Sequence, residues 1–387
     1  MRVVIVGAGY AGLACALRLA RRSRGRADIV LVSGSNQLVE RIRLHEQAAG
    51  ELPRPLPLET LLRGTGVRLR IGWVEAIDLE HETVRVSGES LPFDRLVLAT
   101  GSQTDVDAVP GVRAHAHTLD AASMGALGAT LPAIAARGGR VVVVGGGLTG
   151  IEAASELAER APTLAVELVT RGALAPSFSP RARDHARVVL RRLGVAVREH
   201  VDVHSVAANA LHTADGVTPF DACIWSVGFR ASPLAAESGL SVNARGQAVT
   251  DAMLRATSHP FVYVAGDLAA PQGMHALPMG CKTALPTGLH VAENLARSLA
   301  GRPEQALSAP FYAYCVSLGR RDGLIEAPAR DGRAPRVLTG RVAARFKELV
   351  CRATLWGLAL ERRLAALAVR ASTPPRLLPS MVERTTR

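Results

Sequence analysis

The chain has 387 residues, of which 48% are hydrophobic and 21% charged, and its formal net charge is +12. This length and apolar content predict a globular protein of two or three domains and exclude a disordered chain. No apolar run approaches the roughly 20 residues that span a bilayer. A β-strand that begins at Arg2 leaves no room for a signal peptide, so we expect a cytoplasmic protein.

Basic charge is concentrated near the C-terminus, where residues 330–387 carry 13 Arg and Lys against 4 Asp and Glu. Lys282 and Lys347 are the only lysines of the chain. No cysteine lies within five residues of another; the five are Cys15, Cys223, Cys281, Cys315 and Cys351. This spacing predicts neither a zinc site nor a local redox dithiol, and we expect no bound metal.

The first predicted element is a β-branched strand, residues 3–6, followed by a glycine-rich turn and an Ala/Leu-rich helix to about Arg22. The turn has the spacing G-x-G-x-x-G, and its residues are Gly7, Ala8, Gly9, Tyr10, Ala11 and Gly12. Strand, turn and helix in this order bind the pyrophosphate of a dinucleotide, because the glycines let the backbone approach the phosphates at the helix N-terminus.

The second predicted strand, residues 28–32, ends without the acid that usually binds the adenosine ribose. Ser33 occupies that position. We expect its hydroxyl or backbone to substitute, or Arg41 or Arg43 to reach a phosphate. Nearby, His45 is a catalytic candidate, although a surface or capping histidine is the simpler interpretation.

Further strands are predicted before and after a second copy of the first motif. The strands before it cover residues 67–70, 72–78, 82–86 and 93–99, and a connection with a helix covers residues 111–131. The second copy has glycines at Gly145, Gly147 and Gly150, then a helix over residues 151–160 and a strand over residues 166–170. An internal repeat of this kind indicates two dinucleotide sites, with a non-functional duplicated copy as the alternative.

The second copy ends at Arg171 instead of an acid. An acid there favours NADH, whereas an Arg can accommodate the 2′-phosphate of NADPH, so both nucleotides remain open. Later elements are a helix over 181–192, strands over 195–200, 221–227 and 261–265, a helix over 281–300, and segments 311–318 and 323–328. A long helix is predicted over residues 341–370.

Five motifs in this order resemble the two-dinucleotide flavoprotein reductases, a group within the pyridine nucleotide-disulfide oxidoreductase superfamily. They are GAGYAG at 7–12, LATGS at 98–102, VVVVGGGLTGIE at 141–152, WSVGF at 225–229 and VYVAGD at 262–267. The chain looks most like the type II NADH dehydrogenases and the apoptosis-inducing-factor-like quinone reductases. It does not resemble the disulfide reductases, since no cysteine pair follows the first motif.

The resemblance implies an α/β fold with two Rossmann-like domains, the second inserted in the first, and a small C-terminal domain with a long amphipathic helix. The implied ranges are 1–110 and 252–305 for FAD, 111–251 for NAD(P)H, and 306–387 for the C-terminal domain. Beyond the two glycine-rich turns, the implied cofactor-binding residues are Ser33, Arg41, Val74, Thr100, Gly101, Arg171, Gly228, Gly266, Asp267, Thr283 and Ala284. Val74 would hold the adenine through its backbone, and Asp267 would accept a hydrogen bond from a hydroxyl of the FAD.

Two residues are implied to be catalytic. Glu152 matches a glutamate beside the stacked nicotinamide and flavin. The alternative is an acid in the first turn of a helix that only complements the helix dipole. Lys282 matches a lysine that stabilises negative charge on the reduced flavin, with a solvated helix-start lysine as the alternative. NADH or NADPH would pass a hydride to FAD, and a quinone would take the electrons.

The long C-terminal helix bears on the acceptor. Its apolar stripe consists of Val342, Phe346, Leu349, Ala353, Trp356, Leu360, Leu364 and Leu367, with arginines mostly off the stripe. Such a helix can lie on the inner face of the cell membrane, or it can dock on the protein body or form a homodimer interface.

Other functions remain as alternatives. A ferredoxin or another small electron carrier could dock on the basic surface. A sulfide:quinone oxidoreductase would need paired cysteines near the flavin, where the sequence offers only Cys223 and Cys281. A nucleic-acid-binding flavoprotein would fit the sequence pI of about 10.5, but no motif supports it and aromatics are only 4%.

Overall fold

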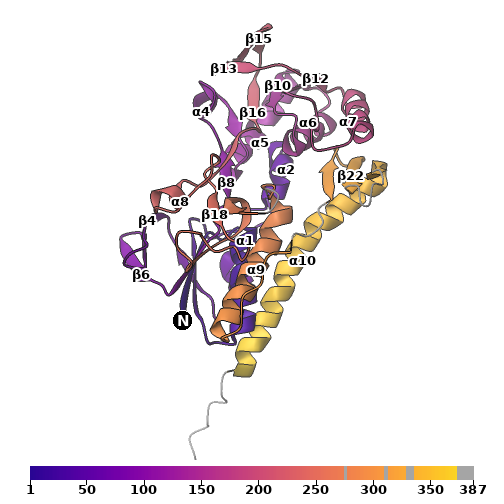
Figure 1. Ribbon diagram of the computed structural model, residues 1–387. Helices are drawn as coiled ribbons and strands as arrows, with labels where there is room; N and C mark the ends of the chain where they lie inside the picture. The colour runs from indigo at the N-terminus through magenta and orange to yellow at the C-terminus, as the bar shows by residue number, and fades with distance from the viewer. Residues whose placement is uncertain (274–276, 309–312, 328–334, 373–387) are drawn as a thin grey trace, which may run out of the picture.

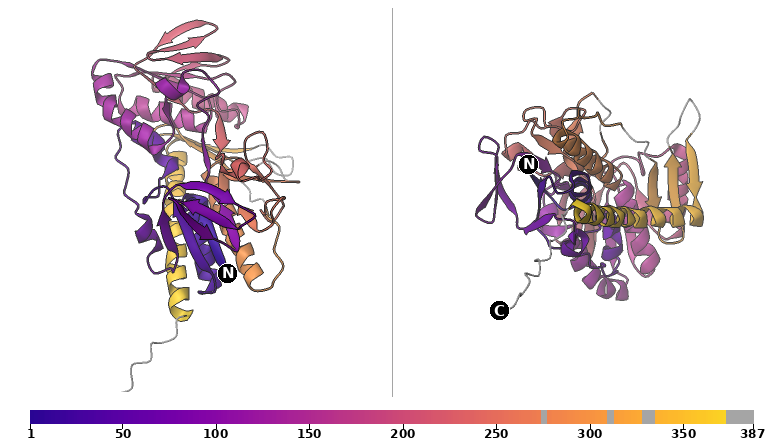
Figure 2. Two further views of the ribbon diagram at one scale, coloured as in Figure 1. Left: turned by 90° about the vertical axis from the view of Figure 1, so that its left-hand side faces the viewer. Right: turned by 90° about the horizontal axis from the view of Figure 1, so that it is seen from below.

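The structure is a computed structural model, and it describes residues 1–273, 277–308, 313–327 and 335–372. The molecule is elongated, and two five-stranded parallel sheets lie in its two halves (Figures 1 and 2). Both sheets are mostly buried runs of Val, Ile and Leu, as expected for parallel strands covered on both faces.

The first sheet has the strand order β19-β7-β1-β2-β3. Its strands are β1 (Arg2–Val6), β2 (Asp28–Ser33), β3 (Arg68–Ile71), β7 (Arg95–Leu98) and β19 (Val262–Val264). Helices α1 (Tyr10–Ser23), α9 (Cys281–Leu299) and α10 (Gly340–Ser372) lie together on one side of the sheet in Figure 1. A meander of β4 (Val74–Asp78), β5 (Thr83–Val86) and β6 (Glu89–Pro92) lies on the opposite side.

The second sheet repeats this plan with the order β12-β11-β10-β16-β9. Its strands are β9 (His117–Thr118), β10 (Arg140–Val144), β11 (Ala165–Val169), β12 (Ala196–Arg198) and β16 (Ala222–Trp225). The helices of this half are α4 (Val112–His115), α5 (Ala121–Ala136), α6 (Leu148–Arg160) and α7 (Pro180–Arg192). Its meander is β13 (Val203–Ala207), β14 (Ala210–Thr213) and β15 (Gly216–Pro219).

Several short elements lie outside the two parallel sheets and the two meanders. Between β2 and β3 lie a 3₁₀ turn η1 (Arg41–Arg43), α2 (Leu44–Ala48) and α3 (Leu58–Leu62). Strand β8 (Ser102–Thr104) pairs with β17 (Phe229–Ala231), and β18 (Ala248–Thr250) pairs with β20 (Ala269–Pro271). The remaining elements are α8 (Leu234–Glu237) and a 3₁₀ turn η2 (Gly266–Leu268).

The packing near one expected domain boundary crosses between the two halves. Residues up to 251 are assigned above to the NAD(P)H-binding domain, but Ala231, Ala235, Leu240 and Ala248 are buried in the hydrophobic core of the first sheet. The chain therefore returns to the first half after β16, although Phe229 still packs against the core of the second half. No change of composition in this part of the sequence marks the crossover.

The C-terminal part is an antiparallel sheet followed by one long helix. Its strands are β21 (Tyr314–Ser317), β22 (Gly323–Ala327) and β23 (Arg336–Thr339). The predicted segment 311–318 lies partly outside the described residues. Helix α10 begins one residue before and ends two residues after the predicted range of 341–370, and it packs along α1.

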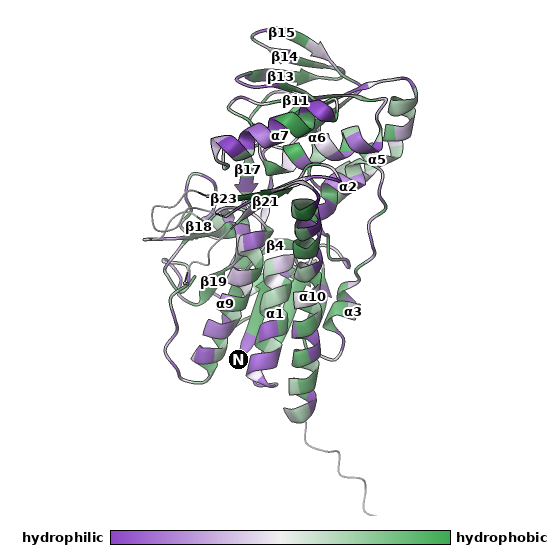
Figure 3. Cartoon of the chain, turned by 90° about the vertical axis from the view of Figure 1, so that its right-hand side faces the viewer, coloured by the Kyte–Doolittle hydropathy of each residue, from purple (hydrophilic) through white to green (hydrophobic). Residues whose placement is uncertain are grey.

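The face by which α10 docks differs from its apolar stripe. The buried side chains of α10 are mostly small or polar: Ala343, Cys351, Thr354, Leu358, Glu361 and Ala365. Arg18 of α1 forms a bidentate ion pair with Glu361 on this face, with nitrogen–oxygen distances of 2.9 and 2.6 Å. The large residues of the stripe are 48–62% exposed at Val342, Phe346, Leu349, Trp356, Leu360 and Leu367. Figure 3 shows hydrophobic residues along much of the visible side of α10.

Candidate active site

The first glycine-rich turn, between β1 and α1, fits a dinucleotide pyrophosphate. Gly7 has a φ of +103°, and a Cβ atom at Gly12 would lie 1.8 Å from the Gly7 carbonyl oxygen. A Cβ atom at Gly9 would meet no other atom within 4 Å. Gly7 and Gly12 are therefore required by the turn itself, whereas Gly9 leaves room in front of the helix N-terminus for a phosphate.

The loops after β2 and β7 hold the residues expected to line the rest of the FAD. Ser33 donates its hydroxyl to the Ser35 carbonyl oxygen at 2.7 Å. Arg41 donates to the Ser102 carbonyl oxygen at 2.7 Å, which brings it beside Gly101. Arg43 instead forms ion pairs with glutamates, so only Arg41 of the two lies at the crossover.

Two unsatisfied hydroxyl groups lie in this region. Thr100 Oγ1 and the Tyr10 hydroxyl are buried and have no hydrogen-bond partner among the described residues. Burial raises the pKa of Tyr10, so its phenol stays protonated. Buried polar atoms without partners are rare in native proteins, and a bound cofactor is a simple way to satisfy them.

The start of α9 and the turn η2 complete the first site. Asp267 accepts hydrogen bonds from the Ser102 hydroxyl at 2.6 Å and from the Gly280 backbone N–H at 2.7 Å. Gly266 has a φ of +73°, and its position lies against Ala11 and Ala284. Thr283 is buried and caps the preceding loop through the Pro278 and Gly280 carbonyl oxygens.

The second glycine-rich turn repeats the geometry of the first. Gly145 has a φ of +126°, a Cβ atom at Gly150 would lie 2.0 Å from the Gly145 carbonyl oxygen, and the space at Gly147 is open. Gly228, also at positive φ, faces Asp105 at the point where the chain crosses between the two halves. Arg171 follows the end of β11 by two residues and is exposed.

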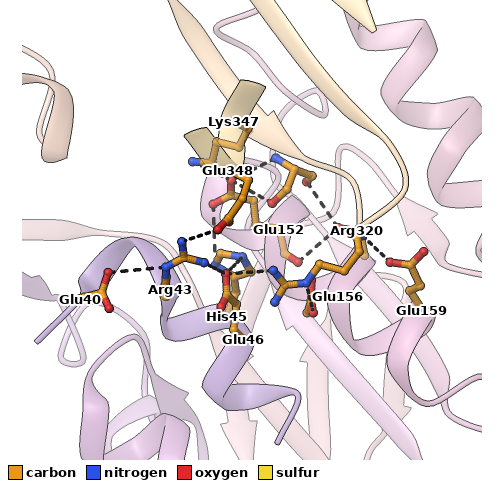
Figure 4. Close-up of polar contacts among 12 residues, drawn as sticks. Glu40, Arg43, His45, Glu46, Glu152, Glu156, Glu159, Arg320, Lys347 and Glu348 are labelled. Carbon is orange, nitrogen blue, oxygen red and sulfur yellow. Dashed lines mark hydrogen bonds and ion pairs between the residues drawn. The ribbon is translucent and has the colours of Figure 1, made fainter. Parts of the chain in front are cut away.

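Glu152, on α6, lies in a buried charged cluster (Figure 4). Its Oε1 atom accepts hydrogen bonds from the Ser317 backbone N–H at 3.1 Å and the Ser317 hydroxyl at 3.2 Å. The same oxygen lies 3.1 Å from the Lys347 Nζ atom. Burial alone would raise the pKa of Glu152, but Lys347, His45 and Ser317 outweigh it and lower this pKa. Burial likewise opposes the charge of Lys347, and the Glu152 carboxylate outweighs it and raises the Lys347 pKa.

His45 is buried, not a surface or capping residue. Its Nδ1 atom lies 4.0 Å from Glu152 Oε2, and burial lowers its pKa. The imidazole is therefore neutral at pH 7 beside a charged carboxylate–ammonium pair.

No sequence motif indicates Lys347 or Ser317 as partners of Glu152. Each lies more than 150 residues from Glu152 in the chain. The only available signal was that Lys347 is one of two lysines in an arginine-rich protein.

Two arginines, Arg43 and Arg320, form ion pairs with glutamates around Glu152 and Lys347. Arg320 pairs with Glu156 at 2.8 Å and Glu46 at 3.2 Å. Arg43 pairs with Glu46 at 2.8 Å and Glu348 at 2.9 Å. Figure 4 shows how these ion pairs bring η1, α2, α6, α10 and the segment after β21 to one place. A cavity of about 540 Å³ opens here, with His45, Ser317, Lys347, Cys351 and Trp356 among its lining residues.

Lys282 is the second residue of α9. Its Nζ atom lies 3.6 Å from the centre of the Tyr314 ring on β21, a cation–π distance. Burial lowers the pKa of this amine. Both lysines of the chain thus come to the boundary between the C-terminal sheet and the two Rossmann-like halves, although 65 residues separate them in sequence.

Three cysteines lie near Lys347, and only one of them, Cys281, is among the two expected near the flavin. Cys223 is buried on β16 in the core of the second half. Cys281, Cys315 and Cys351 instead contribute to the electrostatic environment of Lys347. Burial raises the pKa of all three thiols, that of Cys351 to about 12, so they are protonated and weak nucleophiles. Among the described residues there is no group of three His, Cys, Asp or Glu that could hold a metal ion.

Comparisons with known proteins agree with this geometry. The model of the pyridine nucleotide-disulphide oxidoreductase family matches residues 1–292. An NADH dehydrogenase-like protein of Mycobacterium tuberculosis is 32% identical over 347 residues, covering 82% of this chain and 86% of the relative. A type II NADH:quinone oxidoreductase of Staphylococcus haemolyticus is 27% identical, covering 90% and 94%.

A solved structure shows the same fold at low sequence identity. NDH2 from Plasmodium falciparum, in complex with NADH, superimposes with a TM-score of 0.81 at 14% identity, covering 95% of this chain and 98% of that one. The expected fold class is confirmed: two Rossmann-like domains and a C-terminal part with one long helix. The chain belongs to the pyridine nucleotide-disulphide oxidoreductase family and is an oxidoreductase.

Proposed function

We propose that this protein is an FAD-dependent NAD(P)H:quinone oxidoreductase that acts at a membrane surface. The reaction consumes NAD(P)H, one proton and a quinone, and it yields NAD(P)⁺ and the hydroquinone. Bound FAD supplies the chemistry by accepting a hydride and passing on two electrons. The names of the mycobacterial and staphylococcal relatives support a nicotinamide as donor, and that of the staphylococcal relative supports a quinone as acceptor.

The observation that carries the proposal is the pair of glycine-rich turns. Each turn has one glycine forced by the fold at positive φ, one forced by close packing, and one that faces open space. A duplicated copy that had lost its ligand would have no reason to keep the open position. We therefore assign Gly7, Gly9 and Gly12 to FAD, and Gly145, Gly147 and Gly150 to the nicotinamide dinucleotide.

The two lysines supply positive charge and a proton near the junction. Lys282, at the N-terminal end of α9, would stabilise the negative charge that develops on the cofactor after hydride transfer. The Lys347 Nζ atom lies 3.1 Å from Glu152 Oε1, and this ion pair lies beside the cavity. Reduction of a quinone needs two protons, of which the hydride accounts for one. The Lys347 Nζ atom is placed to hold the other, with Glu152 keeping it charged.

The exposed stripe of α10 supports contact with a membrane. Trp356 and the apolar residues on either side of it face solvent, and arginines border them along the helix. A basic amphipathic helix of this kind binds anionic lipid surfaces. Within the described residues, the structure contains no helix long and apolar enough to cross a bilayer. We propose that the protein lies on the inner face of the cell membrane, where a lipophilic quinone is available.

Anaerobic reduction tests the enzymatic proposal. The purified protein should be yellow, lose its flavin absorbance with NADH or NADPH, and regain it when a soluble quinone is added. A colourless protein that binds no FAD would contradict the proposal. Reoxidation by a ferredoxin and not by the quinone would favour the electron-carrier alternative.

Vesicle flotation tests the membrane proposal separately. The protein should float with vesicles that contain anionic lipid, and a variant with Phe346, Leu360 and Leu367 changed to Ser should not. Because these side chains are exposed, the variant should keep its flavin and its soluble-quinone activity. Equal flotation of both proteins would contradict a role for the stripe.

A further inference from the structure

We propose that the indole of Trp73 is the surface on which the adenine of FAD stacks, and that this contact compensates for the missing ribose-binding acid at Ser33. The inference rests on the proposed FAD site. Trp73 lies outside all five sequence motifs, and this contact would hold the adenosine half of the cofactor.

Ser33 cannot replace the acid in the usual way. Its hydroxyl donates to the Ser35 carbonyl oxygen at 2.7 Å and accepts from the Ser35 backbone N–H at 3.2 Å. Both bonds close the turn that follows β2. A carboxylate would offer two strong acceptors to the ribose hydroxyls, whereas this single hydroxyl is already used within its own loop.

Trp73 lies directly beside that loop. It follows β3 by two residues and precedes Val74, the first residue of β4. A Cβ atom at Gly34 would meet three atoms of the Trp73 ring at 2.8–3.0 Å, so the ring rests against Gly34 because that position lacks a side chain. The Gly72 backbone N–H donates to the Ser33 carbonyl oxygen at 2.8 Å, which fixes the two loops together.

The exposure of Trp73 points to a ligand. The side chain is 79% exposed even though one part of it contacts Gly34. Ile71, which pairs with Ser33 across β2 and β3, is 44% exposed. Two large exposed apolar side chains therefore lie beside the position where a ribose-binding acid would be.

The topology places this surface on the path of the cofactor. In parallel sheets of this type the pyrophosphate binds at the turn after β1, and the adenosine extends across the carboxyl ends of the neighbouring strands. Here those neighbours are β2 and then β3. Val74, whose backbone is assigned to the adenine edge, follows Trp73 in the chain. An aromatic ring beside that backbone offers its face to the purine, and such stacking is a substantial source of affinity.

Titration of the apoprotein with FAD and with FMN tests the inference, because FMN lacks the adenosine. Trp73→Ala should weaken FAD binding by about 5- to 150-fold, the range expected for loss of one base-stacking contact. It should change FMN binding by less than about twofold. Trp73→Phe should retain most of the FAD affinity, since a phenyl ring also stacks. Trp356→Ala removes another exposed tryptophan, far from the turn on α10, and should change neither affinity.

The outcomes separate this inference from the proposed function. Unchanged FAD affinity in Trp73→Ala would overturn the role of Trp73, and so would equal losses for FAD and FMN. A Trp73→Phe variant as weak as Trp73→Ala, with the same melting temperature as wild type, would also overturn a stacking role. Failure of the wild-type protein to bind FAD would instead overturn the proposed function itself.

Discussion

The two glycine-rich units of this protein share a backbone and differ in what surrounds it. In both units the first glycine has a strongly positive φ, and the third packs within about 2 Å of its carbonyl oxygen when a Cβ atom is added. The loops that follow the second strand diverge. In the first unit Ser33 is held in a turn beside Trp73, whereas in the second unit Arg171 is exposed.

The surroundings of the two helices differ as well. Helix α1 is covered by both α9 and α10, and its packing against α9 is so close that a Cβ atom at Gly288 would lie 2.1 Å from the Ala11 carbonyl oxygen. Helix α6 carries Glu152 into a charged cluster beside a cavity. Under the proposed assignment, the same phosphate-binding turn serves a resident cofactor in the first unit and an exchanging substrate in the second, and the two turns differ in what is packed around them.

The largest expected effect comes from the third glycine of each turn. Gly12→Ala should abolish FAD binding, because the new Cβ atom would collide with backbone. Gly150→Ala should leave the protein yellow and abolish its reduction by NAD(P)H. Gly125→Ala, on α5 in open space, is the matched control and should alter neither property. Flavin absorbance before and after addition of NADH measures both, and loss of flavin in Gly150→Ala would break the assignment of the two turns.

Breaking the buried ion pair between Glu152 and Lys347 should strongly lower the free energy of unfolding. Lys347→Met leaves Glu152 charged and buried, so it should lower the free energy of unfolding by about 3–5 kcal/mol at pH 7, measured by urea denaturation. The double variant Glu152→Gln/Lys347→Met should recover much of this loss. A double variant no more stable than Lys347→Met would show that the charge is not the cause.

The pH dependence of the same variants has a defined sign. In the wild type the pKa of Glu152 lies below its ordinary value of 4.5. Its contribution to stability is therefore present above that ordinary value and is lost as the pH falls through the lower folded-state pKa. In Lys347→Met the largest opposing charge is gone, and burial should raise the pKa of Glu152 instead. The stability contributed by this residue should then fall as the pH rises from about 5 to 8.

Variants of Lys282 test whether its positive charge supports turnover. Lys282→Met should lower kcat by roughly 10- to 100-fold while changing the KM for the nucleotide little, because its positive charge matters most after the hydride has moved. Lys282→Arg keeps the charge and should retain more activity. Steady-state kinetics with a soluble quinone measures both, and an unchanged kcat in Lys282→Met would count against the role.

The smallest expected effect concerns nucleotide choice in the second unit. Arg171→Ala should raise the KM for NADPH by about two- to fivefold and leave that for NADH unchanged, since an exposed Arg contributes modestly to binding a phosphate. Arg191→Ala, another exposed arginine at the end of α7, serves as the control. Equal changes for both nucleotides would place Arg171 away from the 2′-phosphate.

Much of the backbone could be predicted from the sequence. The β-branched strands, the glycine spacings and the ends of α10 all depend on neighbouring residues, and all of them agree with the structure within a few residues. The repeat of turn, helix and strand indicated two sheets because each copy carries its own local signals.

The face of α10 that docks could not be predicted in this way. A periodic stripe of large apolar residues is the usual signal for a buried face. Here small residues such as Ala343 and Ala365 allow close packing, and Glu361 is accepted on the buried side because Arg18 neutralises it. The large apolar residues of the stripe are exposed to solvent instead.

Only the tertiary structure decided what meets Glu152 and Ser33. Lys347 reaches Glu152 from the last helix, and Trp73 reaches Gly34 from the connection between β3 and β4. Neither approach leaves a trace in local propensity, because each depends on how segments distant in sequence pack together. The sequence by itself therefore determined the two turns and their order, and the packing around them determined which side chains face a ligand.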